Sequence, residues 1–282
     1  MTETVFQCVL GISSLSLKGL SLQEAIMSAK RAGFDAFELV PQVFQRIKNY
    51  TPRIRRELRK LLEDFSLVTV HTSDIVLEDG CPADISSGDG SLRESSINTY
   101  LEYLELALDV GARVVTFHPG PMDKTSLCCK NRDPYMEFAD IALRFIDSEE
   151  LQLGYEFFDT DLIDSIGDPR FGLLFDVGHA ATLFHGSATR DTLKLLEIAL
   201  PVTVEIHLHG VDFSGTGSMV DHVPLSRSKA INLNEVFQYL IDTDFEGPLV
   251  FEIGIFGNDM GSENIRHSME AREKIISSLE KS

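Results

Sequence analysis

The stretch Gly172-Leu-Leu-Phe-Asp-Val-Gly-His179 places an Asp and a His at the C-terminal end of a short apolar run. The pattern recurs along the chain. Runs at 67–71, 114–118 and 204–209 also end in histidine, and runs at 153–156 and 249–252 end in glutamate. Short, nearly continuous apolar runs are typical of strands buried on both faces of a parallel sheet. Titratable side chains therefore follow several predicted strands at the same end.

Eight strand-like segments alternate with helical patterns. The predicted strands cover 9–14, 36–40, 67–72, 114–118, 152–157, 171–177, 203–209 and 249–253, and the clearest helices cover 21–32, 53–65, 91–110, 134–148, 191–199 and 234–243. Ser21 and Glu24 have the spacing of a capping box, and Gly33 and Gly111 suit the end of a helix. Eight such alternations predict an α/β chain whose parallel sheet closes as a (β/α)8 TIM barrel. An open doubly wound sheet is the alternative, but no GxGxxG follows the first strand.

No linker or change of composition divides the chain, so we expect one TIM-barrel domain over residues 1–282. The formal net charge is −19, which disfavours a nucleic-acid partner because Lys and Arg side chains drive binding to phosphates. The four cysteines form no CxxC motif or disulfide framework. We find neither a long apolar span nor a signal peptide, and we expect a cytoplasmic protein with no membrane partner.

Side chains at the C-terminal ends of barrel strands converge on one mouth, where active sites of such barrels lie. A lone histidine at a strand end is more often a hydrogen-bonded structural residue than a ligand. Many buried imidazoles and carboxylates together, however, need a cation to offset their charge and desolvation. We therefore predict a divalent-metal site. The side chains expected at the mouth are Glu38, His71, His118, Glu156, Asp176, His179, His207, His209, Asp221, His222 and Glu252.

From about residue 9 to about residue 278 the sequence resembles the xylose-isomerase-like barrel superfamily, which includes sugar isomerases and epimerases and the endonuclease IV family (AP endonuclease family 2). The resemblance is carried by five motifs: Phe117-His-Pro-Gly120, Phe175-Asp-Val-Gly-His179, Ile206-His-Leu-His209, Asp221-His-Val-Pro-Leu225 and Phe251-Glu252. It implies a divalent metal (Zn, Mn, Co or Mg) on Glu156, Asp176, His207 and Glu252, with no organic cofactor.

The endonuclease IV branch implies additional zinc ligands. His71 and His118 would join Glu156 at one further ion, and His179 and His222 would hold another.

Three features depart from this nuclease pattern. Val220 occupies the position of a ligand aspartate, next to Asp221. The usual Leu-Gly-x-Gly continuation reads Leu225-Ser-Arg-Ser228, and the usual Glu-Asn reads Glu156-Phe157. The departures and the acidic composition favour a small sugar or sugar-derivative substrate.

The leading hypothesis is a sugar isomerase or epimerase that moves a proton through a metal-stabilised enediolate. Glu156 and Glu252 would shuttle the proton, and His179 would contact a substrate hydroxyl. Glu38 or His71 would line the sugar pocket, while His209 would either support the metal ligands or contact substrate. The alternatives are a zinc phosphodiesterase acting on abasic DNA and a metal-binding barrel without catalysis. The oligomeric state stays open.

Three other residues receive expectations of their own. By strand alternation we expect Glu205 to point away from the barrel interior, and we expect His267 to face solvent. His185 should be peripheral to the site.

Overall fold

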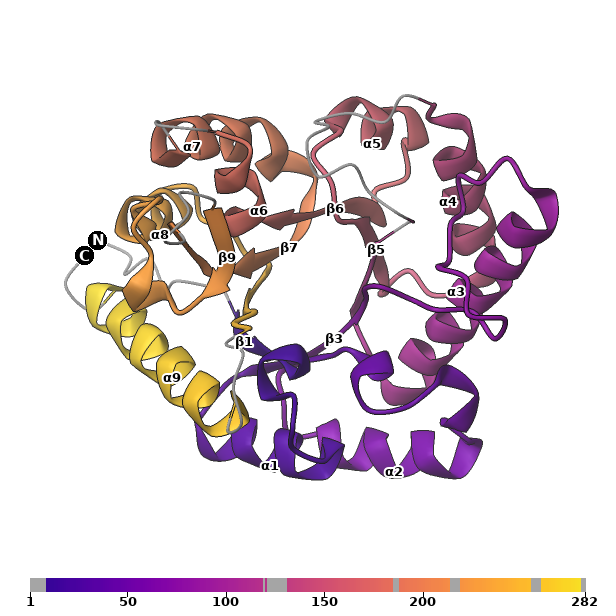
Figure 1. The fold of residues 1–282 in the computed structure, drawn as a ribbon, viewed down its shortest axis with the longest axis horizontal. Helices are drawn as coiled ribbons and strands as arrows, with labels where there is room; N and C mark the ends of the chain where they lie inside the picture. The colour runs from indigo at the N-terminus through magenta and orange to yellow at the C-terminus, as the bar shows by residue number, and fades with distance from the viewer. Residues whose placement is uncertain are drawn as a thin grey trace.

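The computed structural model describes residues 9–118, 120, 131–184, 188–213, 219–254 and 260–279. Eight parallel strands close into a barrel in the order β1-β10-β7-β6-β5-β4-β3-β2 (Figure 1). They are β1 (Val9–Ser13), β2 (Ala36–Leu39), β3 (Leu67–Thr72), β4 (Val114–Phe117), β5 (Gln152–Tyr155), β6 (Phe171–Asp176), β7 (Thr203–Leu208) and β10 (Pro248–Phe251). The (β/α)8 prediction is confirmed, and the eight strands lie where the sequence predicted them.

Helices surround the barrel (Figure 1). They are α1 (Leu22–Arg31), α2 (Pro52–Leu62), α3 (Gly90–Val110), α4 (Asp133–Phe145), α5 (Thr160–Ile166), α6 (Val177–Thr182), α7 (Ala188–Ala199), α8 (Leu233–Asp242) and α9 (Met260–Leu279). Short 3-10 turns form η1 (Ser14–Leu17), η2 (Pro41–Val43), η3 (Ile47–Asn49), η4 (Leu200–Val202) and η5 (Leu225–Arg227). The six predicted helices form with ends shifted by a few residues. Within the described residues, no helix combines the length and apolar character needed to cross a membrane.

Local sequence signals begin and end several of these helices. The backbone N–H of Ser21 donates to Glu24 Oε2 at 2.8 Å, and the backbone N–H of Glu24 donates to Ser21 Oγ at 3.3 Å. The predicted capping box at the start of α1 is therefore confirmed. Gly111 ends α3 with a φ of 80°, a left-handed conformation that glycine adopts without the steric cost of a Cβ.

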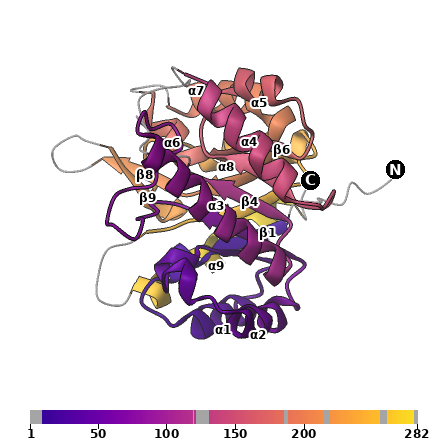
Figure 2. The ribbon, with the colours of Figure 1, turned by 90° about the vertical axis from the view of Figure 1, so that its right-hand side faces the viewer.

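A small antiparallel sheet extends the barrel at the end where β7 finishes. It consists of β8 (Gly210–Phe213) and β9 (Met219–Val223), which lie to one side of the barrel strands in Figure 2. The eight predicted strands did not include this pair. Its importance is positional, because it brings Asp221 and His222 back toward the mouth of the barrel.

The core has an apolar layer between the sheet and the helices. Phe117 on β4 packs edge-on against Tyr100 of α3 and Phe138 of α4, with ring centroids 5.7 and 5.3 Å apart. The side chains that alternate with this layer point into the barrel, and several of them are polar and fully buried, among them Thr69 and Thr116. The barrel interior is thus polar just below its mouth.

Candidate metal centre

Asp176 is fixed by its place between β6 and α6. It is the last residue of the strand and the N-cap of the helix, and its Oδ1 accepts a hydrogen bond of 2.6 Å from the backbone N–H of His179. An aspartate at an N-cap satisfies a helix donor that would otherwise be unpaired. The cap orients the carboxylate so that Oδ2 lies 3.9 Å from Nδ1 of His207. Strand end and helix start together aim Asp176 at the barrel mouth.

Glu156 follows β5 and is surrounded by three imidazoles. Its Oε1 lies 2.8 Å from Nδ1 of His179, and its Oε2 lies 3.4 Å from Nε2 of His71. His118 contacts the same Oε2 through Nε2. The other nitrogen of His71, Nδ1, lies 2.8 Å from Thr116 Oγ1, which orients the His71 ring toward Glu156.

His207 lies between carboxylates on β7. Its Nε2 is 2.8 Å from Glu38 Oε2, and its Nδ1 is 3.2 Å from Glu252 Oε2. Glu252 follows β10, the neighbour of β7 in the barrel. A histidine that donates one ring N–H to a carboxylate presents its other nitrogen to a metal in a fixed orientation. In this arrangement Nδ1 of His207 faces the gap between Asp176 and Glu252.

The β8–β9 pair completes the rim. His222 Nε2 lies 3.2 Å from Glu252 Oε2, and Asp221 Oδ2 lies 3.6 Å from Nε2 of His179. Val220, at the position of the nuclease aspartate, is 40% exposed. Asp221 therefore approaches His179 from the neighbouring position in the chain.

The buried acidic and histidine side chains strongly shift one another's pKa values in the metal-free protein. Burial alone would raise the pKa of Asp176, but His179 and His209 lower it to about 2. Burial would lower the pKa of His179, but Asp176 and Glu156 raise it to about 9. The pKa of His222 is likewise raised to about 10, against the effect of burial, by Asp221 and Glu252. Imidazolium protons thus offset the negative charge where a cation could do so.

The donor geometry fits a metal ion. Ligand atoms of Asp176, His207 and Glu252 lie within 4.8 Å of one another. The same limit holds for Glu156, Asp176 and His179, so Asp176 belongs to both groups. Nitrogen and carboxylate oxygen donors suit zinc and manganese among other divalent ions. The four residues that the family resemblance implied as ligands thus fall into two groups of donors that share Asp176, and no group among the described residues contains all four.

The remaining predicted residues also reach this region. His71, His118 and Glu156 form another group of donors within 4.8 Å, and so do His179, His209 and His222. Glu38 is brought to the site as well, but it lies behind His207 and is fully buried.

Two expectations were wrong. Glu205 points into the barrel, where Thr69 Oγ1 on β3 donates to its Oε1 at 3.0 Å. The reason is the strand period of two, which places Glu205 and His207 on the same face of β7. His267 is only 7% exposed. It shares a face of α9 with Ala271 and Ile275, which are also buried. His185 lies outside the described residues.

Two residues that the sequence motifs did not indicate also shape the site. Thr116 orients His71, and strand alternation could have placed it inside the barrel because it lies two residues before His118. The second residue is Gly178, which lies within the Phe175-Asp-Val-Gly-His179 motif. A Cβ there would lie 1.9 Å from Cε1 of His209, so only glycine fits this position.

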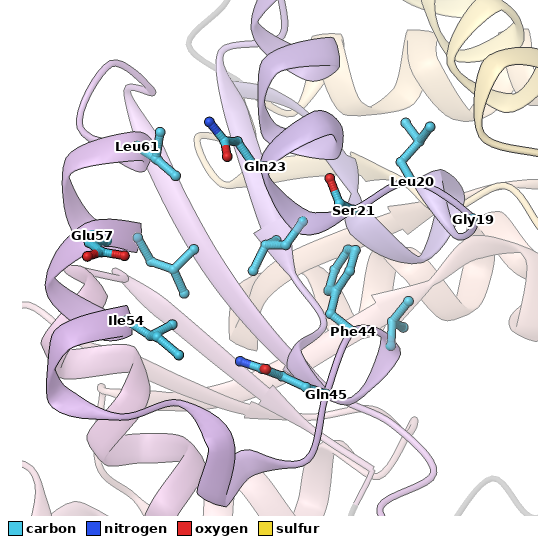
Figure 3. Close-up of a pocket in the computed structure, with 12 residues that line it drawn as sticks. Gly19, Leu20, Ser21, Gln23, Phe44, Gln45, Ile54, Glu57 and Leu61 are labelled. Atoms are coloured by element: carbon cyan, nitrogen blue, oxygen red, sulfur yellow. The ribbon is translucent and has the colours of Figure 1, made fainter.

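A separate hollow of about 630 Å³ lies outside the barrel between α1, α2 and the segment at Val43–Gln45 (Figure 3). Its walls are mainly apolar, with Leu20, Phe44 and Ile54 among them. Glu57, at its edge, pairs with Arg53. No group of potential metal ligands among the described residues lines this hollow, and the groups that the structure does contain lie at the barrel mouth.

Comparison with solved structures shows the same fold in several proteins. A D-tagatose 3-epimerase-like protein has a TM-score of 0.71 at 19% identity, covering 97% of this chain and 98% of its own. D-Psicose 3-epimerase from Clostridium cellulolyticum H10 and an IolI protein with a bound zinc atom each have a TM-score of 0.71 at 14% identity, covering 96% of this chain and 99% of theirs. No curated protein matches the sequence.

The family comparison covers most of the chain. The sequence-family model of the xylose isomerase-like TIM barrel matches residues 26–275 of this chain. This range includes the strands β2 to β10 and all the candidate ligands. The chain therefore belongs to the xylose isomerase-like TIM barrel family.

Proposed function

We propose that this protein is a divalent-metal-dependent isomerase or epimerase of a sugar or sugar derivative, with Glu156, Asp176, His207 and Glu252 as metal ligands. The observation that carries the proposal is the convergence of Asp176, His207 and Glu252 donor atoms within 4.8 Å at a barrel mouth, with Glu156 beside Asp176. Solved structures with this fold include sugar 3-epimerases and a zinc-containing protein, which supports a metal and a sugar here.

A bound divalent ion would polarise the sugar carbonyl and so acidify the neighbouring C–H group. The two glutamates are suited to the proton transfer. Glu156 follows β5 and Glu252 follows β10, and β6 and β7 separate these strands in the barrel. The carboxylates thus stand on different walls of the mouth, as removal of a proton from one face and its return to the other requires.

Both carboxylates are kept in the form that a base needs. Burial would raise the pKa of Glu156, but its histidine neighbours, His118 and His179, hold it well below its ordinary value. His207 and His222 do the same for Glu252, again against the effect of burial. In the proposed reaction the Glu156 carboxylate takes the proton from one face of the sugar. The proton returned on the other face comes from the His222 imidazolium, whose Nε2 is hydrogen-bonded to Glu252 and relays the proton through that carboxylate.

Three of the four predicted substrate contacts separate into two groups. Among the residues that the structure describes, Nε2 of His179 is buried without a hydrogen-bond partner, so we keep His179 as a contact for a sugar hydroxyl. His71 remains a proposed lining residue beside Glu156. Glu38 is engaged with Nε2 of His207 and is fully buried, so we propose that it positions this ligand instead of touching the sugar.

A second candidate, a zinc phosphodiesterase acting on abasic DNA, is favoured by one observation. His71, His118 and Glu156 form a group that could hold a further ion. The formal net charge of −19 and the outward-facing Val220 count against it, because a DNA-binding rim needs cations and the nuclease cluster needs an aspartate at that position.

Deuterium uptake tests the proposed function. The protein is incubated in D₂O with Mn²⁺, Co²⁺, Zn²⁺ or Mg²⁺ and a panel of ketopentoses and ketohexoses, with and without phosphate groups. We expect deuterium to enter one sugar at the carbon beside its carbonyl, because an enediolate exchanges that proton with solvent through Glu156 or Glu252. An abasic-site duplex under the same conditions should stay uncut. Metal-dependent incision of the duplex, with no exchange into any sugar, would favour the phosphodiesterase instead.

A further inference from the structure

We propose that His209 is a positioning residue that holds Asp176 and His222 in place and binds neither metal nor sugar itself. The inference rests on the proposed metal centre and assigns one role to a residue for which the sequence left two open. Three features support this role: the hydrogen bonds of the His209 imidazole, the packing around its ring and the backbone conformation of His222.

The hydrogen bonds determine which nitrogen of His209 carries the proton. The backbone N–H of His222 points at Nδ1 of His209, 2.8 Å away, and a backbone N–H can only donate. Nδ1 is therefore an acceptor without a proton, and the 3.3 Å approach of Gly210 O to it is not a hydrogen bond. The ring proton is on Nε2, which donates to Oδ2 of Asp176 at 3.1 Å.

Both nitrogens of His209 are thus engaged by the protein. A metal at Nδ1 would have to displace the amide of His222, and a metal at Nε2 would have to displace the bond to the buried Asp176. Either change leaves a buried polar group without a partner, which is costly. The group of donors made by His179, His209 and His222 is consequently a weaker metal site than its distances suggest.

The backbone conformation of His222 is a second reason to regard His209 as a positioning residue. His222 has a φ of 54°, the left-handed region that non-glycine residues rarely occupy. Such strain persists where the surroundings impose it. The hydrogen bond to Nδ1 and the stacking of the two rings, with centroids 4.0 Å apart and planes 11° apart, impose it here. This conformation lets Nε2 of His222 reach Glu252.

Packing leaves no room for a ligand on the other side of the His209 ring. The His209 side chain is fully buried. Its Cε1 lies so close to Gly178 that a Cβ on residue 178 would be only 1.9 Å away. His209 therefore ties together three motifs, the Asp176-Val-Gly-His179 turn, its own strand end and the Asp221-His222 pair. Its function is to set the distance between Asp176 and the β9 residues at the rim.

Two substitutions separate the two hydrogen bonds. In His209→Asn the side-chain oxygen replaces Nδ1 as an acceptor for the His222 amide, but nothing reaches Asp176. In His209→Gln the side-chain amide replaces Nε2 as a donor to Asp176, but the His222 amide loses its acceptor. His209→Phe removes both bonds and keeps an aromatic ring. Each variant is compared with wild type for Mn²⁺ affinity by calorimetry and for exchange of the His222 amide by NMR.

We expect His209→Phe and His209→Asn to weaken Mn²⁺ binding by about 10- to 100-fold, the range typical of residues that orient metal ligands. His209→Gln should restore most of the affinity. The His222 amide should stay protected in His209→Asn and exchange faster in His209→Gln and His209→Phe. Wild-type affinity in His209→Phe would overturn the inference, as would equal exchange of the His222 amide in all variants.

The two proposals fail in different ways. If wild type binds no Mn²⁺, the proposed metal centre is wrong, and the exchange of the His222 amide still tests whether His209 holds β9. If wild type binds Mn²⁺ and all three variants bind it equally, the metal centre stands and the role of His209 is wrong.

Discussion

Glu156→Gln is expected to abolish turnover, by at least about a thousandfold, and to release the metal. The carboxylate of Glu156 contacts His71, His118 and His179, and it lies beside Asp176. Glutamine has the same shape but no charge and is a poor metal ligand, so both the base and the ligand are lost. Isotope exchange with the active sugar and elemental analysis of the purified variant measure the two effects.

Glu205→Gln is the matched control, because Glu205 is another fully buried glutamate of the barrel interior. Burial and the neighbouring Glu38 raise the pKa of Glu205 well above its ordinary value, so its replacement by a neutral amide changes the site less than the replacement of Glu156. Its Oε1 accepts a hydrogen bond from Thr69 Oγ1. The control should retain its metal and its activity. Retention of metal and turnover by Glu156→Gln would show that the site has been misplaced.

Gly178→Ala is expected to damage the metal centre by steric means alone. Its new methyl group would lie 1.9 Å from Cε1 of His209, well inside contact distance, so His209 must move. Movement of His209 releases Asp176 and the His222 amide together. Overpacking of this kind costs about 1–3 kcal/mol of stability. We expect Mn²⁺ affinity to fall by about 10- to 100-fold, measured by calorimetry beside thermal unfolding of the metal-free protein.

Gly88→Ala controls for the general effect of replacing glycine. A Cβ at Gly88 meets no atom within 4 Å, so this variant should bind Mn²⁺ like wild type. If Gly178→Ala also binds like wild type and unfolds at the same temperature, then His209 is not confined as the structure shows it.

The barrel could be predicted from the sequence because its strands are nearly continuous apolar runs separated by helical patterns. The approximate position of each titratable group followed from this, since every parallel strand presents its C-terminal end at the same mouth. The alternation of side chains along each strand also indicates which residues point into the barrel. Glu205 had to face inward with His207, and Thr116 had to do so with His118.

Other features depend on contacts between segments far apart in the sequence. The β8–β9 pair has no strong apolar pattern of its own, although it directly follows the buried strand β7. It nevertheless determines where Asp221 and His222 lie. The role of His209 follows from a backbone amide of β9 and a carboxylate at the end of β6. Strand spacing alone cannot indicate which of two neighbouring histidines, His207 or His209, is a ligand of the proposed metal.

The metal content of the wild-type protein tests the central claim most directly. The protein is purified without chelator, and its divalent ions are counted per chain by elemental analysis. We expect one ion of Zn, Mn, Co or Mg per chain, bound by Glu156, Asp176, His207 and Glu252 and lost in Glu156→Gln. Two or three tightly bound zinc ions per chain, or a chain that retains no divalent ion and binds none when it is added, would contradict the account.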